Sequence, residues 1–244
     1  MREANPIRLI VNADDFGLSS EVNKGIIYAH ENGIVSSTSL MVRQSAAKEA
    51  ALLAVEKPNL SIGLHLDLGE WFLRDAVWEP IYQVVDINDK EAVAEEFEKQ
   101  ISQFISLVGR KPTHIDSHQH VHNREALRPI SNSLSAKYRV PVRHSENAPK
   151  YCGKFYGQSE DGSPRLDWIS LDALCQVLRN IDGPAHEICC HPSLGPVENT
   201  MYSDERMHEL ETLCDPVILE VLDESNIEIH NFDDFQFLST SDSH

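Results

Sequence analysis

Residues 7–17 read IRLIVNADDFG, a short apolar run that ends in two adjacent aspartates. Its apolar part, residues 7–12, predicts a buried strand, with the two aspartates directly after it. Ser19 and Ser20 provide N-caps for a helix over residues 21–32, and Gly33 is placed to end that helix. A strand followed at once by a helix is the unit from which parallel sheets are built.

The same alternation continues along the chain. Segment 89–108 carries apolar residues at three- and four-residue steps, which predicts an amphipathic helix closed by Gly109. Further strands are predicted at 35–42, 60–66, 114–122, 140–143, 185–190 and 227–229, and further helices at 46–56, 124–138, 171–180 and between 203 and 222. About seven strand–helix repeats predict one α/β domain over residues 1–244, with the strands in a closed or nearly closed barrel; a doubly wound open sheet is the alternative.

The composition restricts the partners. The chain has 39 acidic and 21 basic residues and a net charge of −18. Nucleic acid or an anionic membrane surface would need clusters of Lys and Arg, so neither is expected, and a neutral or cationic small molecule is favoured. No apolar run is long enough for a secretory signal or a membrane span, and the five cysteines show no CxxC spacing. We therefore expect a cytoplasmic protein with buried, free thiols.

Ionisable residues stand at the predicted carboxyl ends of strands that are far apart in the sequence. In a parallel barrel these ends meet at one mouth, so such residues become neighbours. Two adjacent carboxylates repel each other unless a cation or a shared proton relieves them. The alternatives are a solvated turn at the aspartates and a hydrogen-bonded core role for a histidine that lies between leucines. The residues of this ring are Asp14, Asp15, His65, Asp116, His118, Arg143 and His191.

Residues 114–122, HIDSHQHVH, hold four of the twelve histidines. Strand alternation puts the first histidine, Asp116 and His118 on one face, and it continues through His120 and His122 if the strand lasts that long. An ion with open catalytic positions takes about three protein ligands. The remaining imidazoles are therefore hydrogen-bond donors behind the ligands, substrate contacts or surface groups. A solvated histidine patch is the alternative for the whole run.

Four segments resemble the YdjC-like carbohydrate deacetylases, the family of chitooligosaccharide deacetylase. They are NADDFG at 12–17, GLH at 63–65, HIDSHQHVH at 114–122 and CHP at 190–192, and their order and spacing extend the resemblance over nearly the whole chain. The combination of the first and third segments is specific, unlike either alone. The resemblance implies a distorted (β/α) TIM-like barrel.

The resemblance also implies roles for single residues. Asp14 would be the general base, and His191 would protonate the leaving amine. The usual His-Pro-Gly of the family is His-Pro-Ser in this chain, with Ser193 in the third place. A divalent ion, Mg²⁺ or Zn²⁺, would be bound by three residues. These implied ligands are Asp15, His65 and His118.

The chemistry of amide hydrolysis calls for the same combination of a metal ion, a base and an acid. Amide hydrolysis needs an activated water, a stabilised oxyanion and a protonated leaving nitrogen, which an ion and an acid–base pair supply together. Asp116 is expected to support a ligand imidazole. Arg143 either orients Asp14, binds substrate or forms an ordinary surface salt bridge. Two imidazoles and one carboxylate favour zinc, whereas family members have been assigned magnesium.

Two stretches, 67–88 and 145–167, are too long to be simple connections, and we predict loops that cover the site. Their aromatic residues either stack on sugar rings or pin the loops to the barrel. These aromatic residues include Trp71, Trp78, Tyr151 and Tyr156.

The leading hypothesis is hydrolysis of the N-acetyl group of an amino sugar or short oligosaccharide, with release of acetate. The alternatives are hydrolysis of another amide, a cyclic amide or an ester in a small metabolite, or a non-catalytic sugar-binding relative. An intact base and acid argue against the last, because binding alone needs neither. The oligomeric state is left open, a homodimer included.

Overall fold

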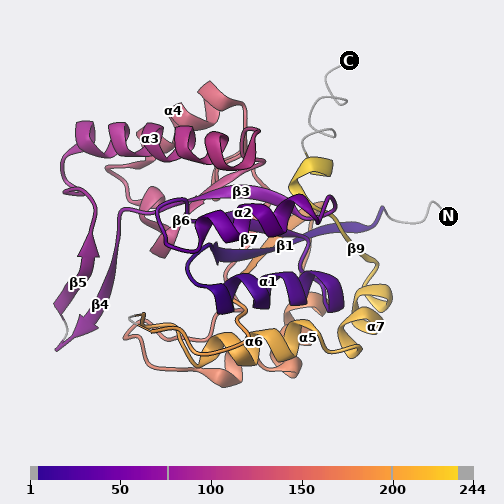
Figure 1. Cartoon of the computed structure of the whole chain (residues 1–244). Coiled ribbons are helices and arrows are strands. Elements are labelled where there is room, and N and C mark those ends of the chain that lie inside the picture. The colour runs from indigo at the N-terminus through magenta and orange to yellow at the C-terminus, as the bar shows by residue number, and fades with distance from the viewer. Residues whose placement is uncertain (1–4, 76, 199, 236–244) are drawn as a thin grey trace, which may run out of the picture.

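The computed structural model describes residues 5–75, 77–198 and 200–235, and it is a single-domain α/β fold (Figure 1). One parallel sheet forms its centre, with hydrogen-bonded order β6-β3-β2-β1-β8-β7, and β9 pairs with the start of β1. The strands of this sheet are β1 Ile7–Phe16, β2 Ser37–Leu40, β3 Ser61–Leu66, β6 Ile115–Ser117, β7 Lys150–Cys152, β8 Ala185–Cys190 and β9 Ile227–Ile229.

The strand order identifies a distorted TIM-like barrel and not a doubly wound sheet. On one side β1 is followed by β2, β3 and β6 in chain order, and on the other side it pairs with β8, which pairs with β7. A doubly wound sheet would place later strands progressively farther from β1 on that side. A single bridge between Ile115 and Val142 continues the sheet beyond β6. The predicted barrel is confirmed, although the segment 140–143, predicted as a strand, contributes only this bridge.

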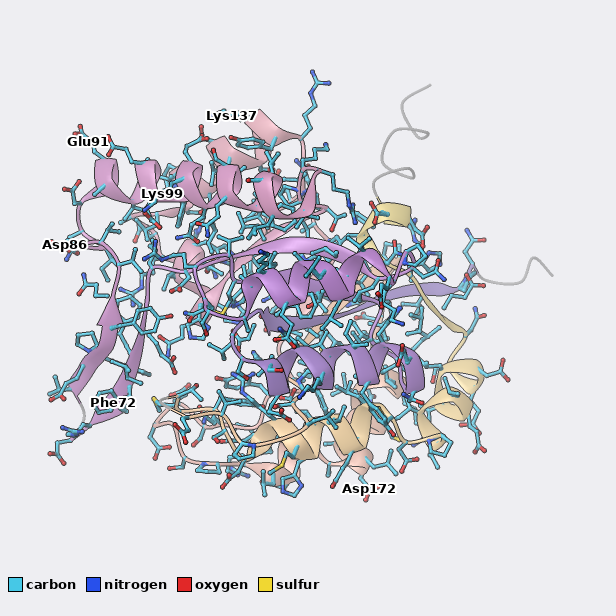
Figure 2. The ribbon with its side chains drawn as sticks, in the orientation of Figure 1. Phe72, Asp86, Glu91, Lys99, Lys137 and Asp172 are labelled. Atoms are coloured by element: carbon cyan, nitrogen blue, oxygen red, sulfur yellow. The ribbon has the colours of Figure 1, made fainter. Side chains whose placement is uncertain are left out.

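Seven helices of the described residues cover the sheet (Figure 1). Their ends follow the sequence signals: the Ser19 side chain accepts a hydrogen bond from the Val22 amide, and Asp89 caps the longest helix. Gly109 ends that helix at φ 78°, in the left-handed region that favours glycine. The Glu91 and Lys99 side chains of this helix are exposed (Figure 2). The helices are α1 Ser20–Asn32, α2 Ala47–Val55, α3 Lys90–Val108, α4 Arg128–Tyr138, α5 Leu171–Arg179, α6 Glu205–Leu213 and α7 Val217–Glu224.

The two faces of β1 differ in chemistry. Leu9, Val11 and Ala13 belong to the hydrophobic core between the sheet and the helices. Asn12 and Asp14, which alternate with them, are buried and hydrogen-bonded to the polar side chains of Ser39 and Arg143. The barrel therefore has an apolar outer layer and a polar interior, and the polar interior is where the site is built.

Three local predictions are wrong. The predicted loop 67–88 contains an antiparallel hairpin, β4 Gly69–Arg74 and β5 Val77–Gln83, which projects from the barrel and carries Phe72 (Figures 1 and 2). The predicted loop 145–167 contains β7 and the start of a short 3-10 turn, Leu166–Ile169. The histidine-rich strand ends at Ser117.

After Ser117 the chain forms a 3-10 segment, His118–Asn123, in which Gln119 and His120 have φ 48° and 51°. This left-handed pair breaks the two-residue alternation. His120 and His122 therefore do not continue the face that carries Asp116.

All five cysteines are free, and Cys152 and Cys214 are only partly buried, so the prediction of buried thiols holds for three of them. No helix among the described residues is long and apolar enough to cross a membrane.

Candidate metal centre and acid–base pair

The two aspartates at the end of β1 both lie at the barrel mouth. Neighbouring strand residues normally point to opposite faces. Here the pairing of β1 with β2 shifts register between Ala13 and Phe16, and Asp15 has φ 68°. This irregularity lets both carboxylates line one cavity, where Asp14 is 2% and Asp15 1% exposed.

Asp15, His65 and His118 form a compact group whose potential ligand atoms all lie within 4.8 Å of one another. Asp15 Oδ1 is 3.2 Å from His65 Nε2 and 3.0 Å from His118 Nδ1. One carboxylate and two imidazoles are ordinary ligands of a catalytic divalent ion, so these residues fit such an ion.

Each member of this group has a charged residue behind it. His65 Nδ1 donates to Asp116 Oδ1 at 2.7 Å, and Asp15 Oδ2 accepts from Arg206 at 2.6 Å. Glu70 Oε2 lies 3.6 Å from His118 Nε2. Carboxylates behind ligand histidines orient the rings and fix their tautomers. Asp116 is thus hydrogen-bonded to His65, one of the imidazoles that the sequence predicts as ligands.

The local charges set the protonation of the two imidazoles. Burial lowers the pKa of both rings, but the neighbouring carboxylates outweigh it. Asp116 and Asp15 raise the pKa of His65 to about 10, and Asp15 and Glu70 raise the pKa of His118 to about 9. Burial raises the pKa of Asp15, whereas Arg206 and His118 hold it well below its usual value.

Asp14 is held by Arg143 through two hydrogen bonds, NH1 to Oδ2 and NH2 to Oδ1, both 2.7 Å long. Arg143 also contacts Asp116 at 2.8 Å and Glu187 at 2.7 Å. Burial raises the pKa of Asp14, but the Arg143 guanidinium has the opposite and larger effect. The net pKa lies below its usual value, and the carboxylate is anionic. Arg143 is 3% exposed, so its interpretation as an ordinary surface salt bridge is wrong.

His191 follows β8 on the other side of the cavity, and one of its ring nitrogens lies within 4.8 Å of an Asp14 carboxylate oxygen. Its Nδ1 is 3.6 Å from Glu209 Oε1, and its backbone amide donates to the same carboxylate. The Tyr202 hydroxyl also donates to Glu209. Glu209, on α6, therefore holds the backbone of His191 and lies beside its ring.

Ser193, the departure from the usual His-Pro-Gly, does not line the cavity. Its hydroxyl donates to the Gly195 carbonyl at 2.7 Å and accepts from the Gly195 amide. The serine thus stabilises the turn after His191.

The remaining histidines of the run have separate places. His120 lines the cavity, with Nε2 3.3 Å from the Tyr151 hydroxyl. His122 lies outside the cavity and uses both ring nitrogens, with Ser117 Oγ and the Arg143 carbonyl. His114 lies in the barrel interior and stacks on Phe232, with ring centroids 3.8 Å apart.

The cavity has a volume of about 760 Å³, and the long segments form its outer wall. Gln119 fastens the hairpin to the barrel, because its side chain accepts from the Trp71 amide at 3.0 Å and donates to the Trp71 carbonyl at 2.7 Å. All four predicted aromatic residues line the cavity, and these are Trp71, Trp78, Tyr151 and Tyr156.

Three residues of the site escaped sequence reasoning. Glu70 lies in a segment predicted to be a loop, and no feature of the sequence singled it out. Arg206 and Glu209 gave no signal, because they belong to a helix about 190 positions from Asp15.

The mouth of the parallel barrel thus brings together a carboxylate–imidazole group that fits a divalent ion and, beside it, a buried carboxylate and a histidine. A model of the YdjC-like protein family matches residues 8–224. The chain therefore belongs to the YdjC-like family, as its motifs predict.

Named relatives are similar over nearly their full length. A carbohydrate deacetylase of Clostridium beijerinckii is 33% identical over 93% of this chain and 100% of its own. A chitooligosaccharide deacetylase of Serratia marcescens is 30% identical over 93% of this chain and 98% of its own.

Solved structures agree with the fold. A crystal structure of an Enterococcus faecalis protein, a candidate cellobiose-phosphate cleavage protein, matches 95% of this chain and 99% of its own at TM-score 0.72 and 29% identity. Peptidoglycan deacetylase PdaC from Bacillus subtilis matches 97% of this chain and 93% of its own at TM-score 0.55 and 10% identity. The latter likeness concerns the fold alone.

Proposed function

We propose that this protein is a metal-dependent hydrolase that removes the N-acetyl group from an N-acetylated amino sugar or short oligosaccharide and releases acetate. The observation that carries the proposal is the opposed pair Asp14 and His191 beside the ligand group formed by Asp15, His65 and His118. The names of the relatives support the same reaction. A protein that only binds sugar would need neither the base nor the acid.

Asp14 is the general base of this proposal. A divalent ion bound by Asp15 and the two imidazoles would lower the pKa of the attacking water and polarise the acetyl carbonyl. Asp14 takes the proton from that water. Arg143 keeps the Asp14 carboxylate anionic and holds both of its oxygens in place. General base catalysis of this kind contributes about 10²–10⁴-fold.

His191 is the general acid. Amide cleavage requires a proton on the departing nitrogen, and His191 lies across the cavity from Asp14, within 4.8 Å. Glu209 holds the His191 backbone by a hydrogen bond and places a carboxylate 3.6 Å from its ring. The base and the acid therefore lie close enough to serve the same scissile bond.

The cavity wall provides a surface for sugar rings. The Trp78 side chain is 54% exposed and Tyr156 36%, and both line the cavity. Exposed aromatic faces bind the apolar C–H faces of sugars. Two imidazoles and one carboxylate bind zinc more tightly than magnesium, so zinc is the ion that we expect to support activity at the lowest concentration.

The test is a screen for acetate release. The protein is stripped with a chelator, supplied with zinc or magnesium, and assayed with N-acetylglucosamine, its disaccharide and simple non-sugar amides and esters. We expect acetate from the sugars only after an ion is restored. Release from non-sugar substrates alone would favour the alternative hydrolase, and full activity in the stripped protein would overturn the role of the ion.

A further inference from the structure

A second group of ligand-type side chains lies beside the first. Cys189 on β8 pairs in register with Asn12 on β1, so its side chain faces the polar interior, whereas Cys190 points into the apolar core. The Cys189 sulfur, an Asp14 oxygen and a His191 nitrogen lie within 4.8 Å of one another. This group shares no residue with Asp15, His65 and His118.

The surroundings suit a bound cation. Asp14 and His191 line the open cavity, so an ion can reach them from solvent, and Cys189 lies behind them with 1% exposure. His191 Nδ1 is buried without a hydrogen-bond partner. The Tyr151 hydroxyl is 2.8 Å from Cys189 Sγ, placed to donate to a thiolate.

We propose that Asp14, Cys189 and His191 form a second, inhibitory site for Zn²⁺. Carboxylate, thiolate and imidazole are the ligands that zinc selects. Tetrahedral zinc with bonds of about 2.0–2.3 Å sets its ligand atoms roughly 3.3–3.8 Å apart, so a small inward movement of the three side chains completes the site. Binding releases the thiol proton to solvent, with no change in oxidation state.

Two features make this site weaker and more selective than the first. Arg143 already holds both oxygens of Asp14, and a cation must compete with that guanidinium. The site therefore fills only when zinc is in excess. Magnesium prefers oxygen ligands and leaves the thiol unbound, so it occupies the first site alone.

The inhibition follows from the proposed function, on which this part of the inference rests. An ion that ties up Asp14 and His191 removes the base and the acid at once. The loss of turnover in excess zinc is therefore expected to reach about 10²-fold or more. Excess magnesium has no such effect.

Metal binding is measured first, independently of activity. Stripped protein is titrated with Zn²⁺ by equilibrium dialysis and with Co²⁺ by absorption, since cobalt bound to thiolate gives a near-ultraviolet charge-transfer band. We expect wild type to bind two zinc ions and to develop the band with the second cobalt. Cys189→Ser should bind one ion without the band. Cys190→Ser, the adjacent cysteine on the opposite face, is the matched control and should behave as wild type.

The activity arm compares turnover with one zinc equivalent and with excess zinc inside each variant. Wild type and Cys190→Ser should be inhibited, and Cys189→Ser should lose most of the inhibition. A wild-type protein that binds one ion and shows no thiolate band overturns the second site but leaves the deacetylase intact. Two bound ions with the band, but no acetate release at any zinc concentration, overturn the proposed function and leave the second site standing.

Discussion

The barrel rim and the cavity wall are built in opposite ways. The rim, defined as Asp14, Asp15, His65, Asp116 and His118, is at most 7% exposed, and every member is ion-paired or hydrogen-bonded to another charged group. The wall, defined as the β4–β5 hairpin and residues 153–162, exposes large apolar side chains. Among these are Val77 at 59%, Trp78 at 54% and Ile81 at 39%.

This difference assigns the chemical step to the rim and substrate binding to the wall. Removing one partner from a buried pair leaves an uncompensated charge, so the rim tolerates little change. An exposed aromatic residue contributes by contact area and can be exchanged at small cost to folding. We therefore expect changes in the rim to alter kcat or metal affinity, and changes in the wall to alter KM.

Asp14→Asn provides the largest contrast. The amide keeps the shape of the carboxylate but cannot accept the proton, so kcat should fall about 10²–10⁴-fold while zinc still binds at the first site. Steady-state kinetics and calorimetric titration with zinc measure the two effects separately. Unchanged turnover would remove Asp14 as the base.

Glu70→Gln tests whether the wall and the rim are independent. Glu70 belongs to the hairpin but faces His118, so its loss should weaken zinc binding about 10–100-fold. Glu79→Gln, on the exposed strand of the same hairpin, is the matched control and should bind zinc as wild type. Equal zinc affinities in the two variants would show that Glu70 does not support His118. The hydrogen bonds between Gln119 and the Trp71 backbone would then be the connection between the two regions.

His114 extends the comparison into the barrel interior. Burial lowers its pKa from 6.5 to about 3, so below about pH 6.5 the unfolded chain binds a proton that the native protein excludes. Stability should thus be lost as the pH falls from 6.5 towards 3, by up to roughly 1.4 kcal/mol per pH unit from this residue. Urea unfolding of wild type and His114→Asn at several pH values measures the difference in slope. Parallel pH profiles for the two proteins would contradict the assignment.

Trp78→Ala gives the smallest effect. Loss of one stacking surface is worth about 0.5–1.5 kcal/mol, so KM for the sugar should rise roughly 2–10-fold with kcat unchanged. Trp168→Ala is the control, since Trp168 is 39% exposed and lies outside the cavity. A fall in kcat without a change in KM would assign Trp78 to the chemistry instead of the wall.

Much of the fold was predictable because its signals are local. The apolar run that begins β1, residues 7–12, and the caps of α3 at Asp89 and Gly109 depend on side chains within a few residues of each other. The β4–β5 hairpin was missed because β5 is exposed or only partly buried along its whole length and carries no alternation of apolar and polar residues. In β4 only the first three residues, Gly69 to Trp71, are buried, which is too short a run to predict a strand.

The sequence by itself determined that carboxylates and imidazoles stand at strand ends, since strand periodicity and barrel topology bring such ends together. Only the tertiary structure decided which of them meet. The left-handed turn at Gln119 and His120 separates His118 from His122, and the α6 side chains Arg206 and Glu209 reach Asp15 and His191 from the far end of the chain. Contacts of this kind depend on how distant elements pack, and a periodicity within one segment carries no information about them.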